Sequence, residues 1–162
     1  MKPSQFALKG FLKGAVILLA LSGLLFWIAR QTQFLECVSN SLTGIRYLIV
    51  VKDVSFKRGD IVSIKNHDVA HVQEQDFAKR ILGLPGDKIL REGNTIHIGN
   101  AILTLLKETK ERHPLTSLTV KVVPERFVFV AGDHPRSFDS RYEEFGLVPI
   151  AKIWGRAIWQ YQ

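Results

Sequence analysis

The chain has 162 residues, enough for one domain with a modest core, and its 46% hydrophobic content excludes a disordered protein. Its formal net charge of +7 would suit a nucleic-acid-binding protein, but four basic residues and no acidic residue lie in residues 1–30. The rest of the chain carries 18 basic and 15 acidic residues without an aromatic-interleaved basic stripe, so we expect no nucleic-acid partner.

Residues 10–30 are predicted to be a transmembrane anchor. Residues 14–29 carry no charge, and about twenty residues of helix span roughly the 30 Å core of a bilayer. Three lysines precede the uncharged stretch 14–29 and only Arg30 follows it closely, so the positive-inside rule places residues 1–9 in the cytoplasm and residues 31–162 outside. The alternative is a cleaved signal peptide, whose apolar region is normally shorter and ends in small residues. We therefore expect a retained, single-pass anchor and a lipid bilayer as partner.

A short polar connector over residues 31–38 leads to a run of small polar residues that contains Ser39 and Ser41. The run enters an apolar segment at 45–51, which predicts a buried strand. Taken alone, two serines at this junction are explained by ordinary turn chemistry. Cys37 is the single cysteine of the chain and excludes an internal disulfide.

Short apolar runs separated by turns recur through the rest of the chain, and no strong amphipathic helix follows the anchor. This regular spacing predicts an all-β domain. The expected strands are 45–51, 61–65, 70–75, 77–82, 88–91, 95–98, 101–106, 118–123, 126–131 and 150–159, with 88–98 forming a hairpin. His67 and His71 have a spacing that would suit a metal on a helix, but the segment lacks helical periodicity, so we expect neither a metal site nor a cofactor.

Lys79 lies on the predicted strand 77–82. A lysine on an apolar strand is costly unless it is solvated, paired or neutral. One interpretation is a lysine that snorkels from a strand edge into water. The turn that follows contains Gly83, Pro85, Gly86 and Asp87.

A second polar stretch, residues 132–141, lies between two apolar strands. In an extended chain the side chains of Asp139 and Arg141 point to the same side and could form an ion pair, and Ser137 alternates with Asp139 in the same way. An ordinary polar loop would also account for this composition.

Together and in this order, these segments resemble the type I signal peptidase family of Ser-Lys membrane peptidases. The resemblance covers nearly the whole chain from the anchor onward. It implies a β-barrel catalytic domain of the signal-peptidase and repressor-protease type, located in the periplasm and tethered to the bacterial inner membrane by one transmembrane helix. The segments that carry it are the anchor, Ser39-x-Ser41, Arg58-Gly59-Asp60, Lys79-Arg80 with Gly83-x-Pro85-Gly86-Asp87, and Gly132-Asp133 with Ser137-x-Asp139-Ser140-Arg141.

Within that family, Ser41-Leu42 followed by Tyr47 looks like the conjugative-transfer branch, whose members process plasmid pilins. About 45 residues separate Asp87 from Gly132. That is too few for the large extra β domain of the long enterobacterial housekeeping enzyme, so a pilin substrate is favoured over general secretory preproteins.

Three positions depart from the family pattern. Thr43 and Ile45 stand where the pilin-processing branch has Pro and Gly, and His134 stands where the family has Asn. The first two make the serine loop the weakest part of the match, whereas the lysine segment is unchanged.

The resemblance assigns a role to each matched residue. Ser41 would be the nucleophile and Lys79 its general base. The backbone N–H of Ser41 and the hydroxyl of Ser39 would form the oxyanion hole. Ser137 would orient the lysine, the Asp139–Arg141 ion pair would brace the loop, and Asp133 would support it. A neutral lysine needs its pKa lowered from about 10.4 to near 8, which costs on the order of 3–4 kcal/mol and is within the reach of burial.

Three other readings of the sequence compete with this one. A Ser-His hydrolase would use His134 with Asp133 and Ser41, but adjacent Asp and His residues do not easily form the required linear arrangement. A self-cleaving repressor-type protease shares the Ser-Lys fold but would carry a DNA-binding or disordered arm in place of a bilayer span. A catalytically decayed β module of a secretion or transfer apparatus is the non-enzymatic alternative, and the intact serine and lysine positions argue against it.

Overall fold

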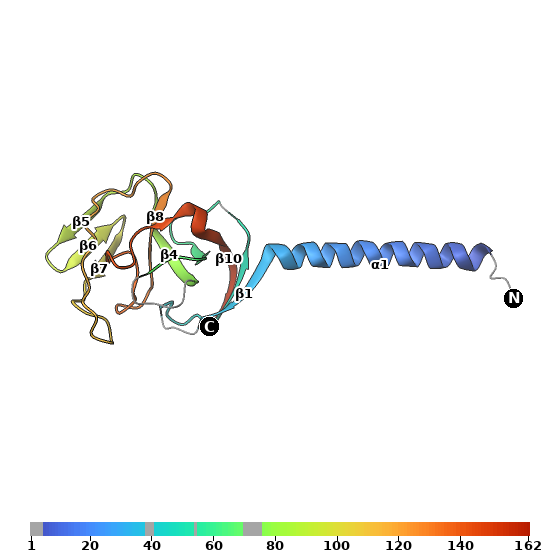
Figure 1. Cartoon of the computed structure of the whole chain (residues 1–162), viewed down its shortest axis with the longest axis horizontal. Helices are drawn as coiled ribbons and strands as arrows, with labels where there is room; N and C mark the ends of the chain where they lie inside the picture. The colour runs from blue at the N-terminus through green and yellow to red at the C-terminus, as the bar shows by residue number, and fades with distance from the viewer. Residues whose placement is uncertain (1–4, 38–40, 54, 70–75) are drawn as a thin grey trace. The chain divides into compact units, whose positions relative to one another are not determined.

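The computed structural model describes residues 5–37, 41–53, 55–69 and 76–162, and it divides into two compact units, Met1–Gln33 and Phe34–Gln162. The first unit contains helix α1 (Gln5–Gln31), drawn in blue in Figure 1. Its segment Gly10–Gln31 is long and apolar enough to cross a membrane. The predicted N-terminal apolar helix is therefore confirmed.

The second unit is built mostly of β-strands, as the turn spacing predicts. The described residues form one seven-stranded and one three-stranded sheet, and a 3-10 turn (Ile150–Lys152) precedes the last strand. The order in the larger sheet is β1 (Thr32–Glu36), β2 (Tyr47–Val51), β10 (Ile153–Tyr161), β3 (Ile61–Ile64), β4 (Phe77–Gly83), β8 (Phe127–Ala131) and β9 (Val148–Pro149). The smaller sheet has the order β5 (Ile89–Glu92), β6 (Thr95–Ile98) and β7 (Ala101–Thr104).

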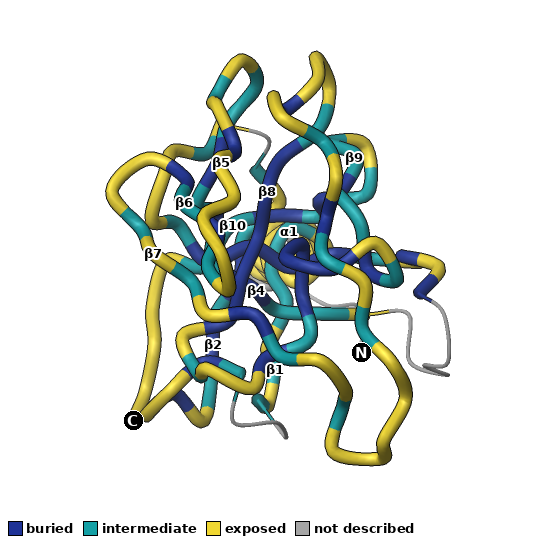
Figure 2. Tube along the Cα trace, turned by 90° about the vertical axis from the view of Figure 1, so that its left-hand side faces the viewer, coloured by how far each residue is buried: buried dark blue, intermediate teal, exposed yellow. Residues whose placement is uncertain are grey.

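The core of this domain lies along the central strands β3, β4 and β8, which pair antiparallel with one another. Figure 2 shows β8 as a nearly continuous buried strand. On β4, Lys79, Ile81 and Gly83 are buried, whereas the residues between them are partly exposed. Because side chains alternate between the two faces of a strand, Lys79 shares the interior face with Ile81.

Most of the predicted strands are present, but two expectations are wrong. Residues 31–38, expected to be a polar connector, contain β1. Residues 118–123, expected to be a strand, form no ladder, because their backbone partners change within a few residues. The Leu118 N–H donates to the Arg141 carbonyl, whereas the Lys121 carbonyl accepts from Ile89 on another element. The predicted strand at 70–75, with His71, lies outside the described residues.

Candidate active site

Lys79 is buried on the interior face of β4, with 4% of its surface exposed. Its Nζ donates to Ser137 Oγ at 2.9 Å and to Ser41 Oγ at 3.1 Å. Burial lowers the pKa of Lys79 to about 8; the Asp139 carboxylate raises this pKa and the Arg141 guanidinium lowers it. Three segments that are far apart in the sequence therefore meet at one amine, which is largely neutral in mildly alkaline solution.

Ser41 lies on the turn between β1 and β2. Its carbonyl accepts hydrogen bonds from the N–H groups of Asp133, at 2.6 Å, and His134, at 3.2 Å. Leu42 and Ile45 are buried beside β2 and anchor the turn in the core. Ile45, one of the departures from the pilin-processing pattern, thus adds apolar contact that glycine would lack.

Gly132 allows the serine turn and the loop with Ser137 to approach each other. Its N–H donates to Asp139 Oδ2 at 3.0 Å. A Cβ atom at this position would overlap the Ser137 side chain and the Ser41 carbonyl. Any larger residue would therefore push apart the two segments that bond to Lys79.

Asp139 and Arg141 form a fully buried ion pair, with 0% and 1% of their surfaces exposed. Two guanidinium nitrogens donate to the two carboxylate oxygens at 2.8 and 2.9 Å. The guanidinium also donates to the carbonyls of Thr104, Pro135 and Ser137. This is a bidentate, charge-assisted ion pair, and through its further hydrogen bonds it connects β7 to the loop that carries Ser137.

Two partly exposed ion pairs flank this centre. The Arg80 guanidinium donates to both Asp133 carboxylate oxygens, at 2.8 and 2.9 Å, and to the Gly59 carbonyl. Arg58 pairs with Asp87 at 2.8 Å. Asp133 therefore contacts the β4 arginine through its side chain and the Ser41 turn through its backbone.

The turn after β4 closes through Asp87, whose carboxylate accepts from the Leu84 N–H. Gly86 has a φ of +86°, a conformation that favours glycine. Gly83 lies so close to Ile98 that a Cβ atom would overlap that side chain. The Gly83–Asp87 segment therefore packs the lysine strand directly against the smaller sheet.

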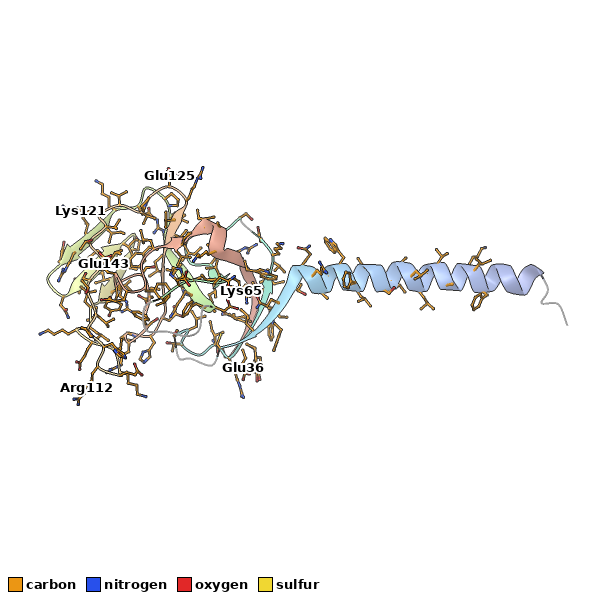
Figure 3. All side chains as sticks on the ribbon, in the orientation of Figure 1. Glu36, Lys65, Arg112, Lys121, Glu125 and Glu143 are labelled. Atoms are coloured by element: carbon orange, nitrogen blue, oxygen red, sulfur yellow. The ribbon has the colours of Figure 1, made fainter. Side chains whose placement is uncertain are left out.

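A cleft of about 280 Å³ opens onto Ser41 and Lys79. Much of it is apolar, because Leu35, Leu42 and Phe77 contribute to its wall. Figure 3 labels two charged residues that also line it, Glu36 and Lys65. The remaining lining residues are Cys37, Ser63, Asp76 and Ala78. The cleft runs past the segments 35–37 and 76–79, so an extended peptide could lie between them.

The sequence did not indicate every residue near the amine. Phe145 is 3% exposed, and its ring centroid lies 6.0 Å from Lys79 Nζ. Phe145 lies just after the polar stretch 132–141, and no motif or periodicity in the sequence marks it as a neighbour of the lysine. The backbone N–H of His134, which bonds to Ser41, is also invisible in a sequence pattern. Ser39, expected to be an oxyanion donor, lies outside the described residues.

Comparison with known proteins identifies a matching family model, related sequences and a similar solved structure. The model of the family described as signal peptidase, peptidase S26, matches residues 8–162. Signal peptidase I of Bacillus licheniformis is 32% identical over 109 residues, which cover 62% of this chain and 56% of that protein. Signal peptidase I of Bacillus caldolyticus is 30% identical over 130 residues, which cover 70% of this chain and 69% of that protein. A crystal structure of a signal peptidase I from Enterococcus faecalis is 29% identical, with a TM-score of 0.43, over 63% of this chain and 96% of that one.

The buried ion pair predicts a large, non-additive stability effect. Asp139→Asn should lower the free energy of unfolding by about 3–5 kcal/mol, because it leaves the Arg141 charge buried without a counter-charge. The double variant Asp139→Asn with Arg141→Met should lose less than the sum of the two single variants. Urea unfolding of the purified chain in detergent measures these values. Asp68→Asn, which changes an exposed carboxylate 4.0 Å from Lys152, is the control and should change stability by less than about 0.5 kcal/mol. Additive losses would show that the two groups do not act as a pair.

Proposed function

This chain belongs to the signal peptidase family, peptidase S26, and we propose that it is a membrane-anchored serine endopeptidase that removes leader segments from exported precursor proteins. The observation that carries the proposal is the contact between the Ser41 hydroxyl and a buried lysine whose pKa is about 8. A serine nucleophile needs a base, and a lysine serves as one only when it is neutral.

In the first step, neutral Lys79 accepts the proton of the Ser41 hydroxyl while Oγ attacks the carbonyl carbon of the scissile bond. The carbonyl oxygen becomes an oxyanion, which we assign to the Ser41 N–H and the Ser39 hydroxyl. As the intermediate collapses, the Lys79 ammonium donates its proton to the leaving nitrogen. The products are an amine and an ester on Ser41.

In the second step, neutral Lys79 removes a proton from a water molecule that attacks the ester. Collapse of this intermediate returns the proton to Ser41 Oγ and releases the carboxylic acid. Ser137 holds the amine through its 2.9 Å hydrogen bond in both steps. The Asp139–Arg141 pair fixes the loop that carries Ser137, because Arg141 bonds to the Ser137 carbonyl.

We assign the substrate segment to the cleft beside β4. Its apolar wall suits small side chains next to the scissile bond, and its strand-like edges suit an extended backbone. We further propose that residues 10–30 anchor the chain in the bacterial inner membrane, that residues 1–9 face the cytoplasm, and that residues 31–162 form the periplasmic catalytic domain. The relatives are named signal peptidase I, which favours secretory preproteins as substrates.

A conjugative pilin is the second candidate substrate. Its support is the sequence Ser41-Leu42 followed by Tyr47, together with the short stretch between Asp87 and Gly132. In this variant of the reaction, the segment removed is C-terminal, so the pilin itself is the acyl group on Ser41, and its own amino terminus replaces water. The amine attacks the ester and loses a proton to Lys79, Lys79 returns this proton to Ser41 Oγ as the ester bond breaks, and the pilin leaves as a cyclic peptide joined by a new amide bond.

Loss of either dyad residue should abolish precursor processing. We expect Ser41→Ala and Lys79→Ala each to accumulate in the membrane at the wild-type level and to leave a co-expressed precursor uncleaved, as seen on immunoblots. Ser55→Ala and Lys121→Ala, which change an exposed serine and an exposed lysine, are matched controls and should process normally. Normal processing by either dyad variant would rule out the proposed mechanism.

Because activity requires neutral Lys79, kcat/KM should depend on pH in a definite direction. Below pH 8 most of the lysine is protonated, so kcat/KM should rise about tenfold per pH unit. Above that pH it should level off. Initial rates on a fluorogenic leader peptide, measured from pH 6 to 10, test this expectation. A profile that is flat from pH 6 to 8 would contradict a lysine base of this pKa.

The two candidate substrates are distinguished by their products. Purified enzyme in detergent is incubated with a secretory preprotein or a pilin precursor, and the products are analysed by mass spectrometry. General signal peptidase activity predicts a cleaved linear preprotein. The pilin alternative predicts cleavage of the pilin precursor alone, and a cyclised product would be lighter than the linear one by one water molecule. Cleavage of the preprotein would reject a dedicated pilin enzyme.

A further inference from the structure

His67 takes no part in the steps above, yet it is buried close to them. The residue follows β3, and 5% of its surface is exposed. Its Nε2 lies 2.9 Å from the Phe145 carbonyl. A carbonyl only accepts hydrogen bonds, so Nε2 carries the hydrogen and the neutral ring has its lone pair on Nδ1. Nδ1 is also buried and has no hydrogen-bond partner among the described residues.

The His67 ring belongs to an aromatic cluster behind Lys79. Its centroid lies 4.8 Å from the Phe145 ring and 6.3 Å from the Phe77 ring. Phe145 also packs edge-on against Phe77 at 5.3 Å and against Phe138 at 5.7 Å. Lys79 Nζ lies over the Phe145 ring, 6.0 Å from its centroid. The Phe145 ring thus connects the histidine to the amine.

The backbone of Phe145 is fixed from two directions. On one side its N–H donates to the Tyr142 carbonyl at 3.2 Å, within a turn that ends at Gly146, where φ is +71°. On the other side its carbonyl accepts from His67. The first contact is local to the turn, whereas the second joins the turn to the end of β3.

We propose that His67 is a positioning residue for Lys79: its Nε2–H bond to the Phe145 carbonyl holds the Phe145 ring against the lysine and keeps water from the amine. This inference rests on the proposed role of Lys79 as the general base. Burial is the largest influence that lowers the pKa of Lys79, so a group that maintains the burial maintains a neutral base at working pH.

The surroundings of His67 favour its neutral form. Burial and the nearby Lys152 lower the pKa of His67, while the hydrogen bond to Phe145 and the nearby Asp68 raise it, and the net direction is downward. On the other side of Phe145, the charged groups that act on Lys79 are Asp139 and Arg141, which neutralise each other. A neutral His67 therefore donates its hydrogen bond without adding a cation to the cluster that surrounds the base.

His67→Leu tests the proposal because it replaces the ring with an apolar side chain of similar size and removes the Nε2–H donor. We expect the pKa of Lys79 to rise by about one unit, which moves the acidic limb of the kcat/KM profile to higher pH. Activity should then fall about tenfold at pH 7 but only about twofold at pH 9. His67→Gln, which retains an N–H donor, should keep the wild-type profile. His97→Leu is the control, because it makes the same change at a half-buried histidine on β6.

The pKa of Lys79 is also measured directly, by following its Cε resonance with pH in protein labelled with ¹³C-lysine. Lys79→Arg identifies the signal. An unchanged Lys79 pKa in His67→Leu would overturn the proposal, even if activity fell at every pH. If the wild-type enzyme cleaved no precursor, the proposed function would fail, but this titration would still decide the role of His67.

Phe145→Leu provides a second route should His67→Leu not fold. It leaves His67 in place and removes the ring that the histidine positions, so the same upward change in the Lys79 pKa is expected. An unchanged pKa in this variant would equally overturn the proposal. In the double variant of His67→Leu with Phe145→Leu, the change in the Lys79 pKa should be no larger than in either single variant, because both substitutions remove the same effect.

Discussion

The structure depends on the burial of one amine. Lys79 occupies an interior position of a central strand, and its pKa falls from 10.5 to about 8. That difference corresponds to about 3 kcal/mol, a sizeable fraction of the stability of a small domain. The two serine hydroxyls that accept from the amine recover part of this cost. The same burial favours the neutral form of the amine, which is the form that the proposed role as a base requires.

The nearby ion pair shows how the domain holds charge in the same region without disturbing the base. Asp139 and Arg141 are both fully buried, and each satisfies the other with two hydrogen bonds. Because their charges cancel, their opposing influences on the Lys79 pKa leave burial as the main one. The pair also fixes the loop beside Gly132, where the serine turn makes its closest approach. The ion pair thus helps to fix the surroundings of Lys79, whereas burial is the main influence on its charge state.

The sequence predicts the parts of this arrangement that depend on local pattern. Strand periodicity puts Lys79 on the same face as Ile81. Asp139 and Arg141 do form the expected pair, but within a turn and not in the extended chain from which the pairing was predicted. The meeting of Ser41 with Lys79 followed only from the family resemblance, because it is a long-range contact that no local periodicity encodes. His67 and Phe145 were missed as neighbours of the base for the same reason. The expected strand at 118–123 is wrong because apolar alternation does not show whether one continuous partner strand is available.

Ser41 and Lys79 lie where the open cleft meets the buried interior of the domain. Ser41 lies at the cleft wall, and the buried Lys79 meets the cleft beside it, so the proposed base is reached next to the proposed nucleophile. Phe77 has two roles in this arrangement, because it lines the cleft and packs against both Phe145 and His67. A peptide in the cleft would displace water from the open side of this cluster, whereas Phe145 excludes water from the closed side. Binding of substrate and neutrality of the base would then favour each other, since both depend on removing water from the same amine.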